Sequence, residues 1–176
     1  MDSSTSAPPD PSHPVPPEPR QETLTTIAAQ VAAIDAVIDL ARLSIRVFDV
    51  DLSDMGWNHS ARADRIATFL RSRRGARLDI VLHDTRWAEK SCPQLTSLLR
   101  HYSHAIAIYR AGEEGKRAMD PMVIVDSRHF VHRFHAGQPR ASFAIEQPKA
   151  AGPLVERFEE IWSSAEPGIN ATVLGL

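Results

Sequence analysis

Short apolar runs that alternate with stretches of helical periodicity constrain the fold of this chain more than any other feature. The runs cover residues 43–50, 78–82 and 105–109, and each has the length of a strand. Between them, over residues 60–75 and 93–102, apolar side chains recur every three or four positions, which is the spacing of one helix face. The order strand, helix, strand, helix, strand is typical of an α/β domain.

The flanking regions add one helix before this pattern and several elements after it. Residues 24–41 carry an apolar stripe at helical spacing, which predicts an amphipathic helix. Three further strands are expected over residues 122–125, 129–134 and 141–145, and a closing helix over 153–164. We therefore predict a mixed β-sheet sandwiched by helices, and not a doubly wound parallel sheet throughout.

The first twenty residues differ in composition from the rest of the chain. They hold seven of the 13 prolines and almost no apolar side chain apart from Val15. Such a segment cannot bury enough surface to offset the entropy of ordering, about 1 to 2 kcal/mol per residue. We expect residues 1–20 to be a disordered proline-rich tail and residues 21–176 to form a single domain.

The rest of the composition excludes several classes of protein. With Cys92 as its single cysteine the chain forms no internal disulfide and no multi-cysteine metal site, and we expect neither a metal nor another cofactor. Its apolar stretches fall short of the roughly 20 residues that a membrane span needs, and no secretory signal is visible. These observations favour a cytoplasmic protein with no membrane contact.

Three histidines, His129, His132 and His135, follow one another at spacings of three. Because this segment reads as a strand, His132 points to the opposite face from the other two, and the three cannot converge on one metal ion. Signatures for phosphate-cradling loops and for serine hydrolases are also missing. Cys92 precedes Pro93 at a predicted helix start and is expected to be a small buried thiol.

Arginines crowd the second predicted helix and its end. Their guanidinium groups match phosphate oxygens, so the cluster is a candidate for phosphate or nucleic-acid binding. The alternative is a solvated helix end whose cations face the helix dipole. Without the tail, acidic and basic residues are equal in number, which argues against nucleic acid as a partner. The candidates are Arg62, Arg65, Arg71, Arg73, Arg74 and Arg77.

Asp126 ends the strand MVIVD within a chain of this element order, and this arrangement resembles one half of the phospholipase D-like superfamily. The family signature HxKxxxxD, aligned on Asp126, places its histidine on Met119 and its lysine on Pro121. The GSxxN element that follows falls on Arg133, Phe134 and Gly137. The family mechanism needs an imidazole nucleophile and a lysine cation, which a thioether and a proline ring do not supply.

The chain also resembles an uncharacterised bacterial family of degenerate phospholipase D-like domains, found alone or attached to acetyltransferase domains. The segments that carry this likeness are RLDIVLHD, MVIVDSR and FEEIWSSAEPG, together with the leucine-rich helix. The resemblance implies a bacterial module for binding, scaffolding or regulation that has no catalytic residues. It also implies a homodimer and leaves room for a protein partner.

A pocket inherited from the superfamily is expected at the C-terminal ends of the strands. Our candidates for its lining are Asp126, Arg128, His83 and Asp84, with Arg133 as a weaker one. The enzyme alternative is a phosphodiesterase or other phosphate-handling hydrolase that uses His83, His129 or His132 in place of the missing histidine. That alternative requires a histidine and a cation to converge on one phosphate position.

Overall fold

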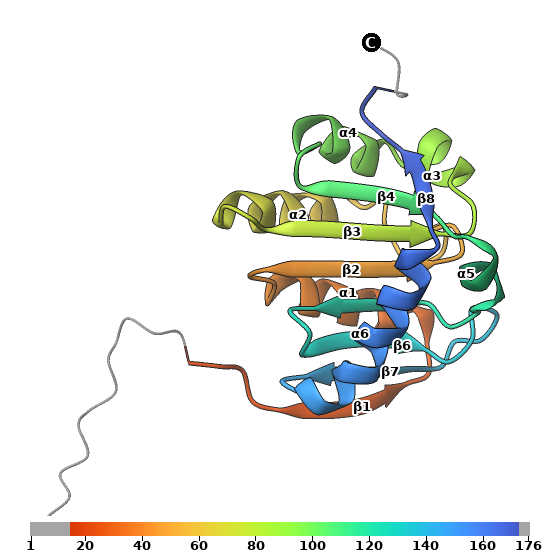
Figure 1. Cartoon of the computed structure of the whole chain (residues 1–176). Coiled ribbons are helices and arrows are strands. Elements are labelled where there is room, and N and C mark those ends of the chain that lie inside the picture. The colour runs from red at the N-terminus through yellow and green to blue at the C-terminus, as the bar shows by residue number, and fades with distance from the viewer. Residues whose placement is uncertain (1–14, 173–176) are drawn as a thin grey trace, which may run out of the picture.

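A computed structural model describes residues 15–172, which are built around one eight-stranded mixed sheet (Figure 1). The strand order across the sheet is β1-β7-β6-β5-β2-β3-β4-β8. The strands are β1 (Arg20–Leu24), β2 (Ser44–Asp49), β3 (Arg77–Leu82), β4 (Ile106–Arg110), β5 (Met122–Val125), β6 (His129–Arg133), β7 (Ala141–Ile145) and β8 (Glu166–Ile169).

Strands β2, β3 and β4 form the parallel part of the sheet. Ile45 lies opposite Leu78, and Leu78 lies opposite Ile106. Helices connect these strands, as parallel pairing requires. The helices of the chain are α1 (Ile27–Asp39), α2 (Ser60–Ser72), α3 (Arg86–Ser91), α4 (Pro93–His101), α5 (Glu113–Arg117) and α6 (Pro148–Ser163).

The other half of the sheet is antiparallel. Strand β5 pairs with β2 in the antiparallel sense, and β6, β7 and β1 continue with antiparallel pairs. On the far side, β8 pairs antiparallel with β4. These pairings confirm the predicted mixed sheet sandwiched by helices. They also mean that β5 ends at the edge of the sheet where β2 begins.

Each face of the sheet has its own core. Ile45 and Val47 point to the larger core, which the sheet forms with α1, α2 and α4. Phe48 and Met122 point the other way, to a smaller core under α6. This division follows from the alternation of side chains along a strand. Figure 1 shows α6 crossing in front of the sheet, with α1 and α2 behind it.

Several boundaries differ from the sequence-based expectation. Arg20, assigned to the tail, is the first residue of β1, while residues 1–14 of that predicted tail lie outside the described residues. The first helix begins at Ile27 and not at Leu24, because the Thr26 side chain accepts a hydrogen bond from the Ala29 amide, 3.1 Å away, and caps it.

The C-terminal helix also starts earlier than predicted. Pro148, and not Pro153, occupies its first turn, and Pro153 lies inside the helix. The edge strands β1 and β8 were not predicted, because their sequences RQETL and EPGI lack the apolar alternation of a strand.

Membrane-spanning helices and clusters of metal ligands are both absent from the described part of the chain. Within residues 15–172, no helix has both the length and the apolar character needed to cross a membrane. The same residues contain no group of three or more histidine, cysteine, aspartate or glutamate side chains placed to hold a metal ion. Cys92 is buried, which raises the pKa of its thiol.

Candidate functional site

Met119, Pro121 and Arg133, three of the positions in the predicted signature alignment, lie at the edge of the sheet where β2 and β6 end. Because β5 is antiparallel to β2, its first residue, Met122, lies opposite Phe48 near the end of β2. The Arg133 amide donates to the Pro121 carbonyl at 2.8 Å, and the Ala136 amide donates to the Met119 carbonyl at 2.7 Å. This edge is therefore the place to look for an inherited site.

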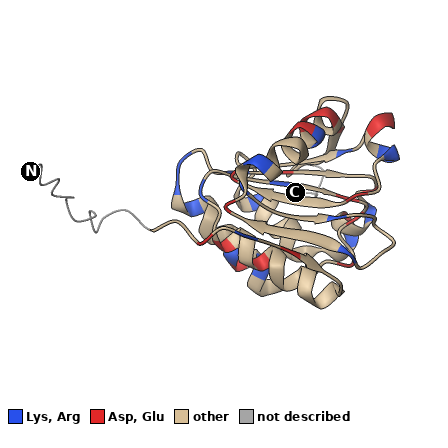
Figure 2. Cartoon of the chain, turned by 90° about the horizontal axis from the view of Figure 1, so that it is seen from below, with Lys and Arg blue, Asp and Glu red and all other residues tan. Residues whose placement is uncertain are grey.

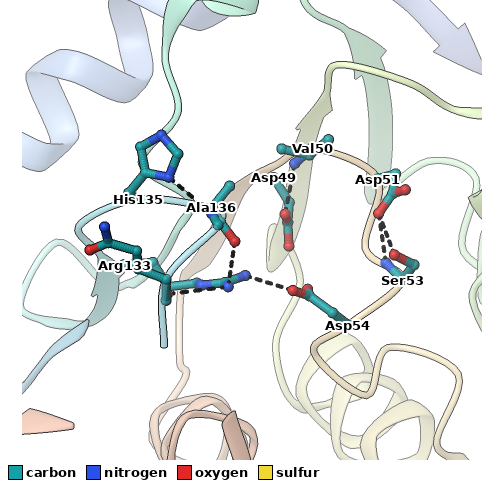
Figure 3. A network of polar contacts seen from close by, with 10 residues as sticks. Asp49, Val50, Asp51, Ser53, Asp54, Arg133, His135 and Ala136 are labelled. Carbon is teal, nitrogen blue, oxygen red and sulfur yellow. Dashed lines mark hydrogen bonds and ion pairs between the residues drawn. The ribbon is translucent and has the colours of Figure 1, made fainter. Parts of the chain in front are cut away.

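Arg133, at the family's glycine position, turns its side chain into this edge. Its Nη1 donates to Asp54 Oδ2 at 3.0 Å, and its Nη2 donates to the Ala136 carbonyl at 2.7 Å (Figure 3). The Arg133 side chain is only 5% exposed. Its guanidinium group is thus held by groups of the chain itself.

Asp49, the last residue of β2, is buried beside this arginine. Its Oδ1 accepts a hydrogen bond from the Val50 amide at 2.7 Å. Burial raises the pKa of Asp49 from 3.8 to about 7, and the neighbouring Asp54 adds to the increase while Arg133 opposes it. This carboxyl group therefore exchanges its proton near neutral pH.

The loop after β2 brings Asp54 to Arg133. Asp51 Oδ1 accepts hydrogen bonds from the Ser53 amide at 2.9 Å and from its hydroxyl at 2.7 Å, which closes a tight turn (Figure 3). Leu52, within this turn, has a φ of 72° and a fully buried side chain. The buried leucine anchors a backbone conformation that non-glycine residues seldom adopt.

Gln30 of α1 lies behind these charges. Its side chain is fully buried, and within the described residues neither of its amide atoms has a hydrogen-bond partner. The Nε atom of Arg133 also has none. Both residues line one narrow cavity together with Asp49, Met55 and Pro121. We call Gln30, Asp49, Asp54 and Arg133 the closed site.

Asp126 and Arg128 lie at the opposite edge of the sheet, so the structure does not bring them together with Arg133. The reason is the antiparallel direction of β5, which ends where β2 begins. Asp126 accepts hydrogen bonds from the backbone amides of Arg42, Leu43 and Ser44 at 2.8 to 2.9 Å. Its carboxylate thus fixes the connection between α1 and β2.

His83 and Asp84 follow β3 at the same edge as the closed site but line a separate pocket beside α5. His83 Nε2 lies 2.9 Å from the Gly115 carbonyl oxygen. Asp84 pairs with Arg86, and hydrogen bonds from that residue lower the pKa of Asp84 to about 2. Neither residue contacts Arg133 in this arrangement.

The histidines of β6 do not form a site with Arg133. His132 and Arg133 are neighbours in one strand and point to opposite faces. His132 Nε2 instead lies 3.0 Å from Asp120 Oδ2. His129, at the other end of the strand, pairs with Glu146 at 3.3 Å, and burial lowers its pKa. Neither histidine therefore converges with Arg133: His132 shares Asp120 with Arg157, and His129 shares Glu146 with Arg128.

The arginine cluster of the sequence divides into buried and exposed members. Arg62 is 0% exposed, so its candidacy as a surface ligand is wrong. It donates to Asp35 at 2.7 Å and to the Val31 carbonyl at 2.9 Å. Arg65 pairs with Asp39. The remaining members, Arg71, Arg73, Arg74 and Arg77, are exposed around the end of α2 and the start of β3.

A family model described as a domain of unknown function, DUF7931, matches residues 26–174. The chain belongs to this family. The matched range of the DUF7931 domain includes the whole closed site. Among curated proteins, no sequence matches the chain significantly.

Solved structures similar to the DUF7931 domain include a DNA-binding protein and phospholipase D relatives. TrmBL2, an archaeal chromatin protein, has a TM-score of 0.65 at 16% identity, and the alignment covers 90% of this chain and 57% of TrmBL2. Nuc from Salmonella typhimurium, a phospholipase D family member, has a TM-score of 0.57 at 17% identity, and the alignment covers 86% of this chain and 99% of Nuc. NucT from Helicobacter pylori has a TM-score of 0.57 at 12% identity, and the alignment covers 86% of this chain and 100% of NucT.

These likenesses show that the DUF7931 domain has a phospholipase D-like fold, with a mixed eight-stranded sheet and helices on both faces. The chain matches Nuc and NucT over almost their whole length, but it spans only 57% of TrmBL2. At these identities the comparison establishes the fold alone.

Sequence reasoning missed three members of the closed site. Gln30 interrupts the apolar stripe of the first helix, and a polar residue on an otherwise apolar face was the signal that could have identified it. Asp49 ends an apolar strand before a turn, where acidic residues are common, so its position gave no specific signal. Asp54 gave no signal, because its approach to Arg133 depends on how the loop folds.

Proposed function

We propose that this domain is a non-catalytic binding module of phospholipase D-like fold that acts in the bacterial cytoplasm. The aligned signature supports this function. Met119 and Pro121 stand where the superfamily signature has its histidine and lysine, and neither side chain can attack phosphorus or hold a phosphate oxygen.

The observation that carries the proposal is the engagement of Arg133. The guanidinium group of Arg133 donates hydrogen bonds to Asp54 and to the Ala136 carbonyl, so it is not free to hold a phosphate. Asp49 lies buried beside it, so a phosphate at this place would lie close to the carboxyl groups of Asp49 and Asp54. The inherited site is therefore filled by the domain's own side chains.

The comparisons supply a direction for the binding partner. TrmBL2, one of the similar proteins, binds DNA, although sequence composition argued against nucleic acid for this chain. For the DUF7931 domain, a phosphate-backbone ligand is accordingly the class to test. The homodimer stays a prediction from the superfamily resemblance.

Hydrolysis assays test the absence of catalysis. We expect no protein-dependent release of 4-nitrophenol from bis(4-nitrophenyl) phosphate and no nicking of plasmid DNA, with and without divalent metal ions. The histidine variant His132→Ala and its exposed control His104→Ala should be equally inactive. Hydrolysis by the wild-type chain that His132→Ala abolishes and His104→Ala retains would overturn the proposal.

A further inference from the structure

Arginines gather in the connections at the edge of the sheet opposite the closed site. These connections lead into the parallel strands β2, β3 and β4, and the turn between β5 and β6 lies beside them. We call this surface the basic edge. Its arginines are Arg42, Arg71, Arg73, Arg74, Arg77, Arg100 and Arg128.

Acidic groups at the basic edge are already engaged. The Asp126 carboxylate accepts three backbone amides. Asp39 pairs with Arg65. Asp79 lies 3.1 Å from Arg77. Asp39 and Asp79 are therefore paired with arginines, whereas Asp126 keeps its negative charge beside the backbone of Arg42.

Glu146 is the other acid near this surface. It lies 3.4 Å from Arg128 and 3.3 Å from His129. The Arg128 side chain is still 50% exposed, so one side of its guanidinium group faces solvent. A ligand can therefore reach Arg128 without breaking this pair.

Arg42, Arg73 and Arg74 are the available cations of the basic edge. All three are exposed, and within residues 15–172 their guanidinium groups form no ion pair or hydrogen bond. Figure 2 shows blue segments in the connections at this end of the sheet and also at the other end. Three unpaired guanidinium groups on one edge can bind several phosphates of one polyanion.

A groove of about 680 Å³ crosses the basic edge. Arg42, Arg73 and Arg128 line it from three different connections, and Pro16 and Pro17 form part of its wall. The acids Asp39, Asp126 and Glu146 line it as well. Its described lining contains no phenylalanine, tyrosine or tryptophan. Without such rings there is no platform on which single-stranded bases can stack. The groove is thus suited to a backbone and not to unpaired bases.

Overall neutrality hides this asymmetry. The loops at the opposite edge contain more acids, several of them paired with cations of the same loops such as Arg86, Arg110 and Lys116, so an average over the domain does not describe the basic edge. The acids of those loops are Asp49, Asp51, Asp54, Asp84, Glu113, Glu114, Asp120 and Glu166. The equal numbers of charges that argued against nucleic acid therefore do not apply to the basic edge alone.

We propose that the basic edge binds the sugar-phosphate backbone of duplex nucleic acid without reading its sequence. This inference rests on the proposed binding function and names its ligand class. Arginine forks match phosphate oxygens, and contacts from several connections suit a ligand that carries a regular row of phosphates. The inherited closed site takes no part in the contact.

The test is fluorescence anisotropy of the full chain with a fluorescein-labelled duplex of about 20 base pairs, in EDTA, between about 50 and 200 mM salt. The variant is Arg42→Gln with Arg73→Gln, two exposed positions of the basic edge. The matched control is Arg110→Gln with Arg117→Gln, which removes the same charge from exposed positions at the other edge. Circular dichroism verifies that all three proteins are folded.

We expect the wild-type affinity to fall with salt with a log-log slope of about −3, for three to four phosphate contacts. The double variant should bind at least about tenfold more weakly and lose about 2 from the magnitude of that slope. The control should stay within about twofold of wild type. No binding at the lowest salt, or equal weakening in variant and control, would overturn the inference.

A gel of the same samples separates this inference from the proposed function. Duplex that is neither bound nor cut removes the nucleic-acid ligand and leaves the non-catalytic module standing. Cleavage of the duplex on addition of divalent metal ions contradicts the non-catalytic function, whatever the affinity in EDTA.

Discussion

The two edges of the sheet use their charges in opposite ways. At the closed site, Arg133 is buried and its fork is held by Asp54 and by a backbone carbonyl. At the basic edge, Arg42 and Arg73 are exposed and have no ion-pair partner within residues 15–172. An arginine that satisfies the chain's own groups stabilises the fold, whereas an exposed and unpaired one remains available to a ligand.

This difference separates inheritance of a fold from inheritance of a site. Strands β2, β5 and β6 are paired with one another, and the edge where β2 and β6 end is filled by side chains of the chain itself. The basic edge, which we propose as the binding surface, lies at the opposite ends of the same strands. Fold similarity alone does not show which edge binds a ligand.

The largest expected effect concerns the pH dependence of stability at the closed site. Because the folded state raises the pKa of Asp49 from 3.8 to about 7, it binds this proton more tightly than the unfolded chain does. The free energy of unfolding should therefore fall as pH rises from about 4 to about 7, by up to about 4 kcal/mol from this group.

The variant Asp49→Asn isolates this effect in urea unfolding between pH 4 and 8. It should match the wild type near pH 4 and be increasingly more stable than it toward pH 8. The control Asp64→Asn removes an exposed carboxylate and should follow the wild type. Parallel profiles for the wild type and Asp49→Asn would show that the closed site is not a buried carboxyl site.

A second expected difference contrasts single arginines of the two edges. Arg133→Ala deletes a buried side chain with charge-assisted hydrogen bonds and should lower the free energy of unfolding by about 2 to 3 kcal/mol. Arg73→Ala deletes an exposed side chain and should change it by less than about 0.5 kcal/mol. Thermal and urea unfolding measure the stability of both variants. An equal loss in the free energy of unfolding for Arg133→Ala and Arg73→Ala would remove the distinction between the edges.

A smaller effect sharpens the role of Asp126 at the basic edge. Asp126→Ala removes the acceptor for three backbone amides and should cost about 2 kcal/mol. Asp126→Asn keeps one oxygen and tolerates the positive φ of 51°, so it should cost about half as much. Urea unfolding tests the order, and an unchanged stability in Asp126→Ala would contradict the anchoring role.

The sequence predicted the middle of the fold well, because the buried strands are marked by apolar side chains. Residues 122–125, for example, are all buried and were recognised as a strand. The edge strand β1 was missed because most of its side chains face solvent and need not be apolar. The pattern of apolar side chains in a short segment indicates burial, so it does not identify a strand whose side chains are exposed.

The site was harder to predict, because it depends on the direction of one strand. Asp126 and Arg133 are close in sequence, and only the pairing of β5 with β2 shows that they lie at opposite edges. Arg62 looked like its exposed neighbours but is buried against Asp35 and Trp57. The local sequence pattern does not predict long-range strand pairing or the burial of a charged side chain of this kind.

An amide ¹H–¹⁵N NMR titration of the full chain with the duplex at low salt decides directly which edge of the sheet binds. We predict shifts for the backbone amides of Arg42, Arg73 and Arg128, and unchanged positions for those of Asp49, Asp54 and Arg133. Shifts centred on the closed site, with the basic edge unperturbed, would contradict the division between a closed inherited site and an available basic edge.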